Sequence, residues 1–197
     1  ITAQALLIDE IQDIISDNVP ILEKCQAHWG WETGLRHRMY AGTPKTTNNT
    51  LTRRYRQSSQ FEWIVPCTHC TFDNFLDEKV IGRVGYICAK CGGDIFMGAG
   101  RWVPMNPAAL NLSWGFRIPQ MMVPYVTHAD ILSQLEDPNI SRLKFYNETL
   151  GLPYDEGELI LTESIMQRAS EENRTNLTPL QLGIIARSGT PVFAGID

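Results

Sequence analysis

Two short stretches, Cys67-Thr-His-Cys70 and Cys88-Ala-Lys-Cys91, decide how the middle of this chain folds. The two-residue gap inside each pair lets one tight turn direct two sulfurs at the same ion. The 17 residues between the pairs match the spacing of four-thiolate structural zinc sites. The sequence therefore predicts a zinc ribbon over residues 66–100. Its expected metal ligands are Cys67, Cys70, Cys88 and Cys91.

The sequence around the cysteines also indicates how the ribbon folds. Gly92 and Gly93 follow the second pair and supply the backbone freedom that a tight turn needs. The segment between the pairs holds little apolar mass, so the metal is expected to supply much of the folding free energy. His69 lies between two better ligands and is expected to face solvent. The alternative is a pair of disulfides, which requires an oxidising compartment that nothing else in the sequence indicates.

Composition sets outer limits on the fold and its partners. The chain has 197 residues, of which 43% are hydrophobic, enough for one large domain or two small ones. The net charge of -5 argues against a protein that coats nucleic acid, so any DNA contact is expected to be a local patch. The fifth cysteine, Cys25, is expected to be a buried thiol in a reducing cytosol. No signal peptide or transmembrane run is present, so we expect no membrane partner.

Near the N-terminus, the run Ala5-Leu-Leu-Ile-Asp9-Glu10 is apolar and ends in two acids. This pattern is typical of a buried parallel strand that delivers carboxylates at its C-terminal edge. In P-loop ATPases such a strand is the Walker B motif, whose Asp holds Mg²⁺ and whose Glu polarises the attacking water. An ordinary buried strand that runs into an acidic helix start explains the same residues equally well.

The segments that follow add context to this strand. Asp17-Asn18 is expected to cap a helix, and residues 35–41 are expected to form a strand that closes in Gly42-Thr43-Pro44. P-loop motors place the loop that senses the γ-phosphate at this position; an ordinary β-turn is the alternative. Helical spacing predicts that the first helix buries one face, formed by Ile21, Leu22, Cys25 and Trp29.

A basic helix is expected next, over residues 48–58. Its arginines, Arg53, Arg54 and Arg56, surround Tyr55 and either contact phosphate or form a solvated helix face. A strand over 61–65 is expected to lead into the ribbon.

The rest of the chain is predicted as extended aromatic pieces followed by helices. The aromatic residues of 101–104 and 113–119 are expected to lie mostly in the core. Thr127 and Asp130 have near capping-box spacing. Helices are expected over 127–135, over 139–150 with Ile140, Leu143, Tyr146 and Leu150 inward, and over 162–172, with a last strand from Pro191.

Taken in order, these motifs resemble the large subunit of tailed-phage terminases, in the lambda-like GpA group. The matching pieces cover nearly the whole chain and are modest one by one but specific together. They are Leu6-Leu-Ile-Asp9-Glu10, Ala41-Gly-Thr-Pro44, Pro66-Cys67-Thr-His-Cys70, Tyr86-Ile-Cys88-Ala-Lys-Cys91-Gly, Lys144-Phe-Tyr-Asn-Glu-Thr-Leu-Gly151 and Phe193-Ala-Gly-Ile-Asp197.

The resemblance implies an α/β fold in four parts. Residues 1–65 would be the C-terminal part of a P-loop, RecA-like ATPase domain, and 66–100 the zinc ribbon. Residues 101–190 would be the remainder of the ATPase and a helical linker, and 191–197 the first strand of an RNase H-like nuclease.

The resemblance also implies an enzyme that packages double-stranded viral DNA into procapsids at the expense of ATP and cuts concatemeric DNA. On that basis Asp9 would coordinate Mg²⁺, Glu10 would activate water, and Gly42, Thr43 and Pro44 would form the loop that couples nucleotide state to DNA movement. Asp197 would be the first carboxylate of a divalent-metal site in the nuclease.

Further implications concern partners and completeness. The partners would be double-stranded DNA, a small terminase subunit, the portal of the procapsid, and further copies of the chain in a ring, in the host cytoplasm. The sequence holds no G-x-x-x-x-G-K-[ST] loop, so that loop and the other nuclease carboxylates are expected outside it. We expect the chain alone to be an inactive fragment.

Two other interpretations stay open. Asp9-Glu10-Ile-Gln12 resembles the DExQ box of helicases, some of which carry zinc ribbons. The absence of apolar strands alternating with helices after Leu150 counts against a second RecA-like domain. The other interpretation is a non-catalytic zinc-ribbon module that binds nucleic acid or protein, with the two acids incidental.

Overall fold

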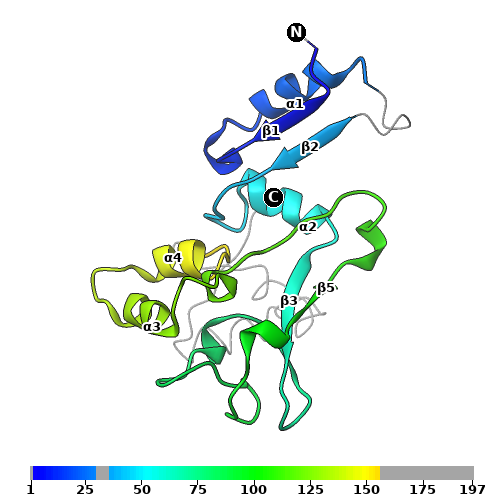
Figure 1. Ribbon diagram of the computed structural model, residues 1–197. Coiled ribbons are helices and arrows are strands. Elements are labelled where there is room, and N and C mark those ends of the chain that lie inside the picture. Colours follow the sequence, from blue (N-terminus) through cyan, green and yellow to red (C-terminus); the bar gives the residue numbers. More distant parts are fainter. Residues whose placement is uncertain (1, 30–35, 156–197) are drawn as a thin grey trace, which may run out of the picture. The chain divides into compact units, whose positions relative to one another are not determined.

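The first strands of the chain form a small parallel sheet in the computed structural model, which describes residues 2–29 and 36–155. Strand β1 (Ala5–Ile8) pairs with β2 (His37–Tyr40) so that Leu7 lies opposite Met39. Helix α1 (Asn18–Glu23) lies between them in sequence (Figure 1). The parallel strand was predicted, but its predicted burial is wrong, because only Ile8 of β1 is buried. Since the two strands run parallel, their carboxyl ends point the same way.

The predicted buried face of the first helix is wrong. Ile21 is 60% exposed and Cys25 is only half-buried, whereas Val19 and Gln26 are buried. Helical periodicity fails here because α1 ends at Glu23 and a 3₁₀ turn follows. The buried amide of Gln26 is satisfied by polar partners: it donates to the carbonyls of Gln4 at 2.9 Å and His37 at 2.8 Å and accepts from Arg38.

A second sheet leads into the predicted ribbon (Figure 1). Helix α2 (Thr50–Gln57) is capped by Asn49, and β3 (Phe61–Pro66) follows it, as predicted. Strand β3 pairs antiparallel with β4 (Asp73–Asn74) on one side and with β5 (Arg101–Pro104) on the other.

Two short helices complete the described part of the chain. Helix α3 (His128–Glu136) begins with the predicted capping box, in which Thr127 and Asp130 bond to each other's backbone N–H groups. The helix predicted over 139–150 is instead α4 (Arg142–Lys144) followed by a π-helical turn, Phe145–Thr149.

That π-turn corrects the predicted inward face. The Leu150 N–H bonds to the Phe145 carbonyl at 3.2 Å, an i→i+5 bond that shifts the helical register by one residue. Phe145 is therefore buried together with the predicted Leu150. Ile140 and Tyr146 are half-buried and pack against the same core, as predicted, whereas Leu143 is half-buried and is not among the residues of that core. The helix ends at Gly151, whose positive φ of 63° fits the predicted stop.

The aromatic pieces are also less buried than predicted. Trp114 is 70% exposed and Phe116 is 45% exposed, and Phe116 stacks on Phe61 with ring centroids 4.8 Å apart. These rings lie on a strand-like segment at the sheet margin rather than inside the core, since Phe61 bridges in parallel to Phe116.

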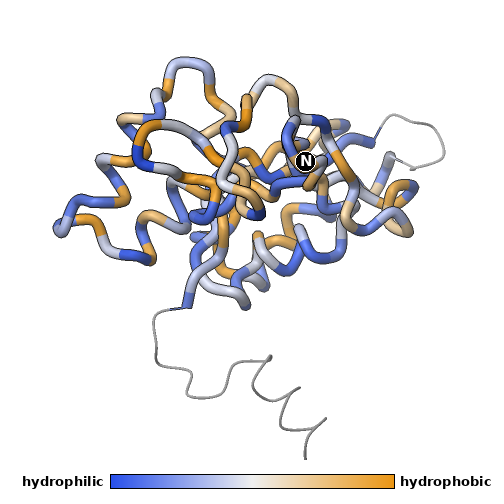
Figure 2. The backbone as a smooth tube through the Cα atoms, turned by 90° about the horizontal axis from the view of Figure 1, so that it is seen from below, coloured by the Kyte–Doolittle hydropathy of each residue, from blue (hydrophilic) through white to orange (hydrophobic). Residues whose placement is uncertain are grey.

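The described residues form a mixed α/β unit with small sheets. Polar and apolar residues are interspersed along the backbone (Figure 2). No helix within 2–29 and 36–155 is long and apolar enough to cross a membrane. The helix predicted over 162–172, the strand from Pro191 and Asp197 lie outside the described residues.

Candidate functional site

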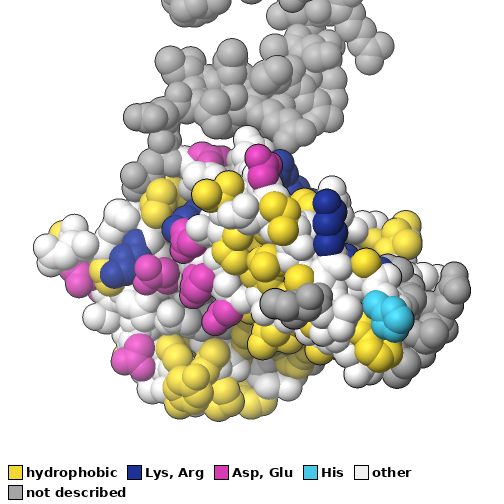
Figure 3. All heavy atoms as spheres, turned by 90° about the horizontal axis from the view of Figure 1, so that it is seen from above, with side chains coloured by type: hydrophobic (Ala, Val, Ile, Leu, Met, Phe, Trp, Pro, Cys, Tyr) yellow, Lys and Arg dark blue, Asp and Glu magenta, His cyan; other side chains and the backbone are white. Residues whose placement is uncertain are grey.

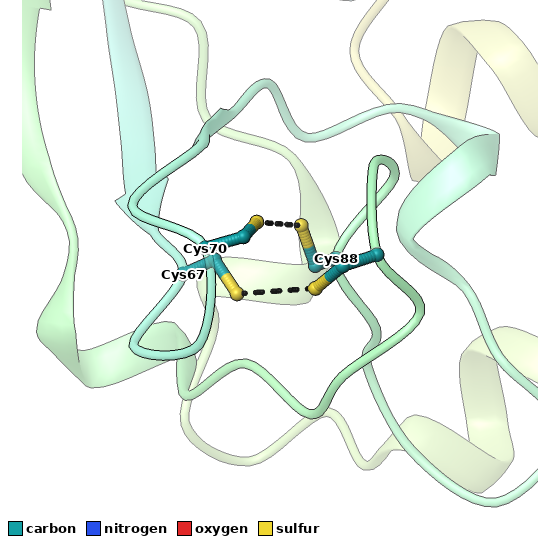
Figure 4. A group of neighbouring side chains, drawn as sticks. Cys67, Cys70 and Cys88 are labelled. Carbon is teal, nitrogen blue, oxygen red and sulfur yellow. Dashed lines mark hydrogen bonds between the residues drawn. The ribbon is translucent and has the colours of Figure 1, made fainter.

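The four predicted metal ligands converge on one point. Their sulfur atoms all lie within 4.8 Å of one another (Figure 4), with 3.6 Å between Cys67 and Cys91 and 3.6 Å between Cys70 and Cys88. A zinc ion bound tetrahedrally at about 2.3 Å requires sulfurs about 3.8 Å apart, whereas a disulfide bond measures about 2.05 Å. The four thiols are free and could hold a metal ion such as zinc, as predicted.

The first knuckle is a loop held by three hydrogen bonds to Cys67. Its sulfur accepts the His69 N–H at 3.4 Å, its carbonyl accepts the Thr71 N–H at 3.0 Å, and its own N–H donates to the Phe72 carbonyl at 2.9 Å. Thr71 has a φ of 57°, a left-handed conformation that is unfavourable for a β-branched residue.

The second knuckle repeats the same loop around Cys88. Its sulfur accepts the Lys90 N–H at 3.4 Å, its carbonyl accepts the Gly92 N–H at 2.9 Å, and its N–H donates to the Gly93 carbonyl at 2.7 Å. Gly92 has a φ of 72° at the position matching Thr71, so the predicted need for glycine is confirmed here.

The electrostatics of the cysteines favour a bound cation. Burial raises the pKa of the Cys88 thiol, but the N–H groups of Cys91 and Lys90 outweigh it and bring the pKa to about 6. At Cys70 the Phe72 N–H lowers the pKa, but desolvation and the neighbouring sulfurs raise it to about 12. A bound metal ion would supply positive charge that stabilises thiolates, and its binding would release protons.

The segment between the knuckles contributes more to the core than predicted. Leu76 and Val80 are fully buried beside Cys67 and Cys88. Sequence inspection missed Asn74, which is also fully buried. It donates to the Val65 carbonyl at 3.0 Å and accepts the Ala89 N–H at 2.9 Å, so it links the two knuckles. Apolar packing therefore contributes to the stability of the ribbon.

His69 is exposed, as predicted. It is not among the four clustered ligands, and its ring lies against Gly93, where an added Cβ would come within 2.8 Å of it. This side chain covers the second knuckle from outside rather than binding the ion.

A second candidate site lies where β1 and β2 end. The Ala41 N–H donates to the Ile8 carbonyl at 2.8 Å, and the Ile11 N–H donates to the Ala41 carbonyl at 3.1 Å. These bonds extend the parallel ladder past the strands and bring the two predicted motifs together at one edge. The motifs are Asp9-Glu10 and Gly42-Thr43-Pro44.

Both carboxylates at this edge are exposed. Asp9 accepts the Glu10 N–H at 3.0 Å, and Glu10 has a φ of 51°, a left-handed conformation that is costly for a non-glycine residue and is common at functional sites. Carboxylate oxygens are the donors that Mg²⁺ prefers, and within the part of the chain that the structure describes no Lys or Arg pairs with either acid.

Two further residues connect the turns at this edge. Gln12 donates to the Glu10 carboxylate, and Lys45 forms an ion pair with Asp13. Sequence analysis noted Gln12 only as the last residue of the DExQ-like box, and it missed Lys45, whose one signal was its position directly after Pro44.

One of the three arginines of the basic helix α2 is held by contacts within the protein, and the other two are exposed. Arg54 pairs with Glu23 at 2.7 Å and lies 4.2 Å above the Tyr40 ring, which favours a packing role for this arginine. Arg53 and Arg56 are exposed, and neither has an acidic partner among the described residues. A phosphate contact therefore stays a prediction for these two.

Comparisons of the chain with protein-family models, with curated proteins and with solved structures gave no match.

Proposed function

We propose that this chain carries the Walker B strand and the phosphate-sensing turn of a DNA-translocating ATPase, the large subunit of a tailed-phage terminase in the lambda-like GpA group. One observation carries the proposal. The parallel pairing of β1 and β2 brings Asp9 and Glu10 beside Gly42-Thr43-Pro44 at the carboxyl edge, where ligands of open α/β sheets bind.

The chemistry assigned to each residue follows from its place at this edge. MgATP supplies the electrophilic phosphoryl group. Asp9 presents oxygen donors for the hydrated cation, and Glu10 orients a water molecule and accepts its proton. Thr43 is half-buried and offers a hydroxyl to phosphate oxygens, while Pro44 fixes the turn.

The state of the small sheet supports the proposal. Leu7 is 66% exposed and Met39 is 61% exposed although they are cross-strand neighbours, so one face of the parallel pair is bare (Figure 3 shows apolar side chains at the surface of this part). Parallel sheets are normally covered on both faces, and two strands alone are marginally stable. The strands therefore suit a larger sheet, as a P-loop domain requires.

The remaining roles rest on the resemblance. Double-stranded DNA, a small terminase subunit and the procapsid portal are the proposed partners, with a ring of copies as the working form in the host cytoplasm. Asp197 is proposed as a ligand of the nuclease metal. The zinc ion would brace the ribbon.

The test is ATP turnover by the full-length protein in the presence of double-stranded DNA. We expect Glu10→Gln to lower kcat about 100-fold or more with ATP binding retained, and Asp9→Asn to weaken the Mg²⁺ dependence as well. Asp17→Asn, an exposed acid away from the edge, is the matched control and should leave both unchanged. Equal turnover in all three variants would contradict the proposal.

A non-catalytic zinc-ribbon module is the second candidate, and the well-packed core around the ribbon favours it. It predicts that Asp9→Asn leaves function intact, whereas Cys67→Ser abolishes binding of the partner. Loss of turnover in Asp9→Asn with DNA binding retained would exclude a pure binding module.

A further inference from the structure

We propose that Gln12 is a positioning residue, which holds the Glu10 carboxylate and ties it to the turn at Gly42. The inference rests on the proposed function, because it concerns the regulation of the same site. It arises from the contacts of one side chain that bridges the segment after β1 and the segment after β2.

The side-chain nitrogen of Gln12 faces acids. Gln12 lies in the 3₁₀ turn Ile11–Asp13, and its Nε2 donates to the Glu10 carboxylate and lies 3.4 Å from the Asp13 carboxylate. Ionised carboxylates only accept hydrogen bonds, so the amide nitrogen must face them. This requirement fixes the orientation of the amide and directs its oxygen, Oε1, the other way.

The side-chain oxygen of Gln12 meets the opposite turn. Oε1 is buried and has no hydrogen-bond partner. A Cβ added at Gly42 would lie 1.9 Å from this oxygen and 3.0 Å from Cδ of the same side chain. The amide therefore fits only because residue 42 has no side chain, and any movement of the turn changes the space that it occupies.

The unpaired Oε1 of Gln12 argues that this side chain positions Glu10 and does not merely fill space. An apolar side chain of the same length would fill this space without burying an unsatisfied acceptor, so the amide is costly for stability alone. What the amide adds is the bond to Glu10, whose backbone is held in a left-handed conformation. A shift of the Gly42 turn on nucleotide binding or release would reach the Glu10 carboxylate through this side chain.

The first test compares Gln12→Met with Gln57→Met in the full-length protein. Methionine keeps the length and removes the donor, and Gln57 is an exposed glutamine on α2 that serves as the matched control. We expect Gln12→Met to lower kcat about 10- to 100-fold with the KM for ATP within about threefold, because positioning acts on the chemical step. Without nucleotide, amide hydrogen exchange should rise in residues 41–43 of Gln12→Met only.

A double-mutant cycle tests the bridge itself. Gly42→Ala should displace the amide and give a similar loss of kcat, and the Gln12→Met/Gly42→Ala double variant should be no slower than either single variant. Fully additive losses would overturn the link between the two residues. If Gln12→Met loses its thermal unfolding transition, Gln12→Asn replaces it, since the amide is kept but no longer reaches Glu10, and the same loss of kcat is expected.

The outcomes separate this inference from the proposed function. Normal kcat and exchange in Gln12→Met, together with a Glu10→Gln variant that no longer turns over ATP, would overturn the role of Gln12 and leave the proposed function standing. A Glu10→Gln variant with wild-type turnover would overturn the proposed function and the role of Gln12 with it.

Discussion

The region around the ribbon and the region around β1 and β2 differ in how much buried core stabilises them. Among the described residues, the core that includes the ribbon contains ten buried residues, and Cys67 and Cys88 are two of them. They come from β3, the knuckles, α3, the π-turn and the segments between these elements. The core under β1 and β2 contains three, Ile8, Ile11 and Val19. The first part can hold its shape by packing and metal binding, whereas the second exposes its acids and one sheet face. The difference indicates that stability resides in one part and the proposed chemistry in the other.

The buried charges follow the same division. Around the ribbon, Arg117 pairs with Glu62 at 2.7 Å and donates to the carbonyls of Leu76 at 3.0 Å and Leu150 at 2.6 Å. Burial raises the pKa of Glu62 above its ordinary value, although Arg117 and the Tyr55 hydroxyl act in the opposite direction. This one guanidinium joins β3, the ribbon and the last helical turn.

Near β1 and β2 the ion pairs are more open. Glu23 receives Arg38 at 3.1 Å, Arg54 at 2.7 Å and the Tyr40 hydroxyl. Burial raises the pKa of Glu23, but the Tyr40 hydroxyl and the two guanidinium groups outweigh it, so the pKa lies below its ordinary value. This partly buried cluster joins α1, β2 and α2.

Removal of the metal should have the largest effect on stability, and this effect should be confined to the ribbon region. We expect a chelator to lower the melting temperature by about 10–20 °C, or about 5 kcal/mol, because the ribbon core loses its central ion. Hydrogen exchange should rise over residues 63–97 and stay unchanged in β1 and β2. Cys25→Ser, outside the cluster, should not reproduce the effect. Ellipticity that does not respond to chelation would contradict a structural metal.

Breaking the buried ion pair should come next in size. Glu62→Gln leaves the Arg117 charge buried without its partner, so we expect a loss of about 3–5 kcal/mol in the free energy of unfolding. Arg101→Ala removes the exposed pair with Asp73 and should cost about 1 kcal/mol or less. Denaturant titration of both variants measures the difference, and similar costs would show that the Glu62 pair is not a stabilising link.

The exposed face of the β1–β2 sheet, which carries Leu7 and Met39, gives a prediction that tests whether this region is less buried than the ribbon region in the full-length protein as well. If β1 and β2 belong to a larger sheet, Leu7→Lys in the full-length protein should cost about 2–3 kcal/mol, because the side chain is then covered. Val84→Lys, at a residue that is 96% exposed, is the control and should change stability by about 0.5 kcal/mol or less. Thermal unfolding in which both variants match the wild type would mean that this face is open to solvent in the full-length protein too.

The smallest effect should be the pH dependence of the stability that Glu23 contributes through its contacts with Arg38, Arg54 and Tyr40. A carboxyl whose pKa is lowered on folding stabilises the protein above its unfolded pKa, about 4.5 here, and loses that contribution as pH falls through the folded pKa. The wild type should therefore exceed Glu23→Gln by about 0.5–1 kcal/mol at neutral pH, and the two should converge in acid. Urea titrations at several pH values test this, and a gap that does not shrink at all as the pH falls below 4.5 would contradict the assignment.

Features set by short-range patterns were predictable from the sequence. The spacing of Cys67, Cys70, Cys88 and Cys91 predicted their convergence, since each knuckle is a local turn. Apolar runs bounded by proline or acids predicted β1 and β3, and the segment between Gly34 and Gly42 was predicted as the strand that contains β2. Thr127 and Asp130 predicted a capping box, because its bonds span only three residues.

Features set by distant partners were not predictable. Gln26 is buried because two strands need its amide, and Arg117 is buried because Glu62 lies opposite, 55 residues away in sequence. Thr71 has a left-handed backbone like Gly92 at the equivalent position of the other knuckle, although its residue type does not indicate it. The register of Phe145 depends on a π-turn that no local rule indicates.

Single-turnover hydrolysis of ATP by the full-length protein tests the central claim most directly, because it isolates the chemical step at the β1–β2 edge. Wild type and Glu10→Gln are each mixed in excess with labelled ATP and Mg²⁺, and bound and hydrolysed nucleotide are followed over time. We predict equal binding and a hydrolysis step at least about 100-fold slower in Glu10→Gln. Equal binding with equal rates of hydrolysis would contradict the assignment of this edge to ATP hydrolysis.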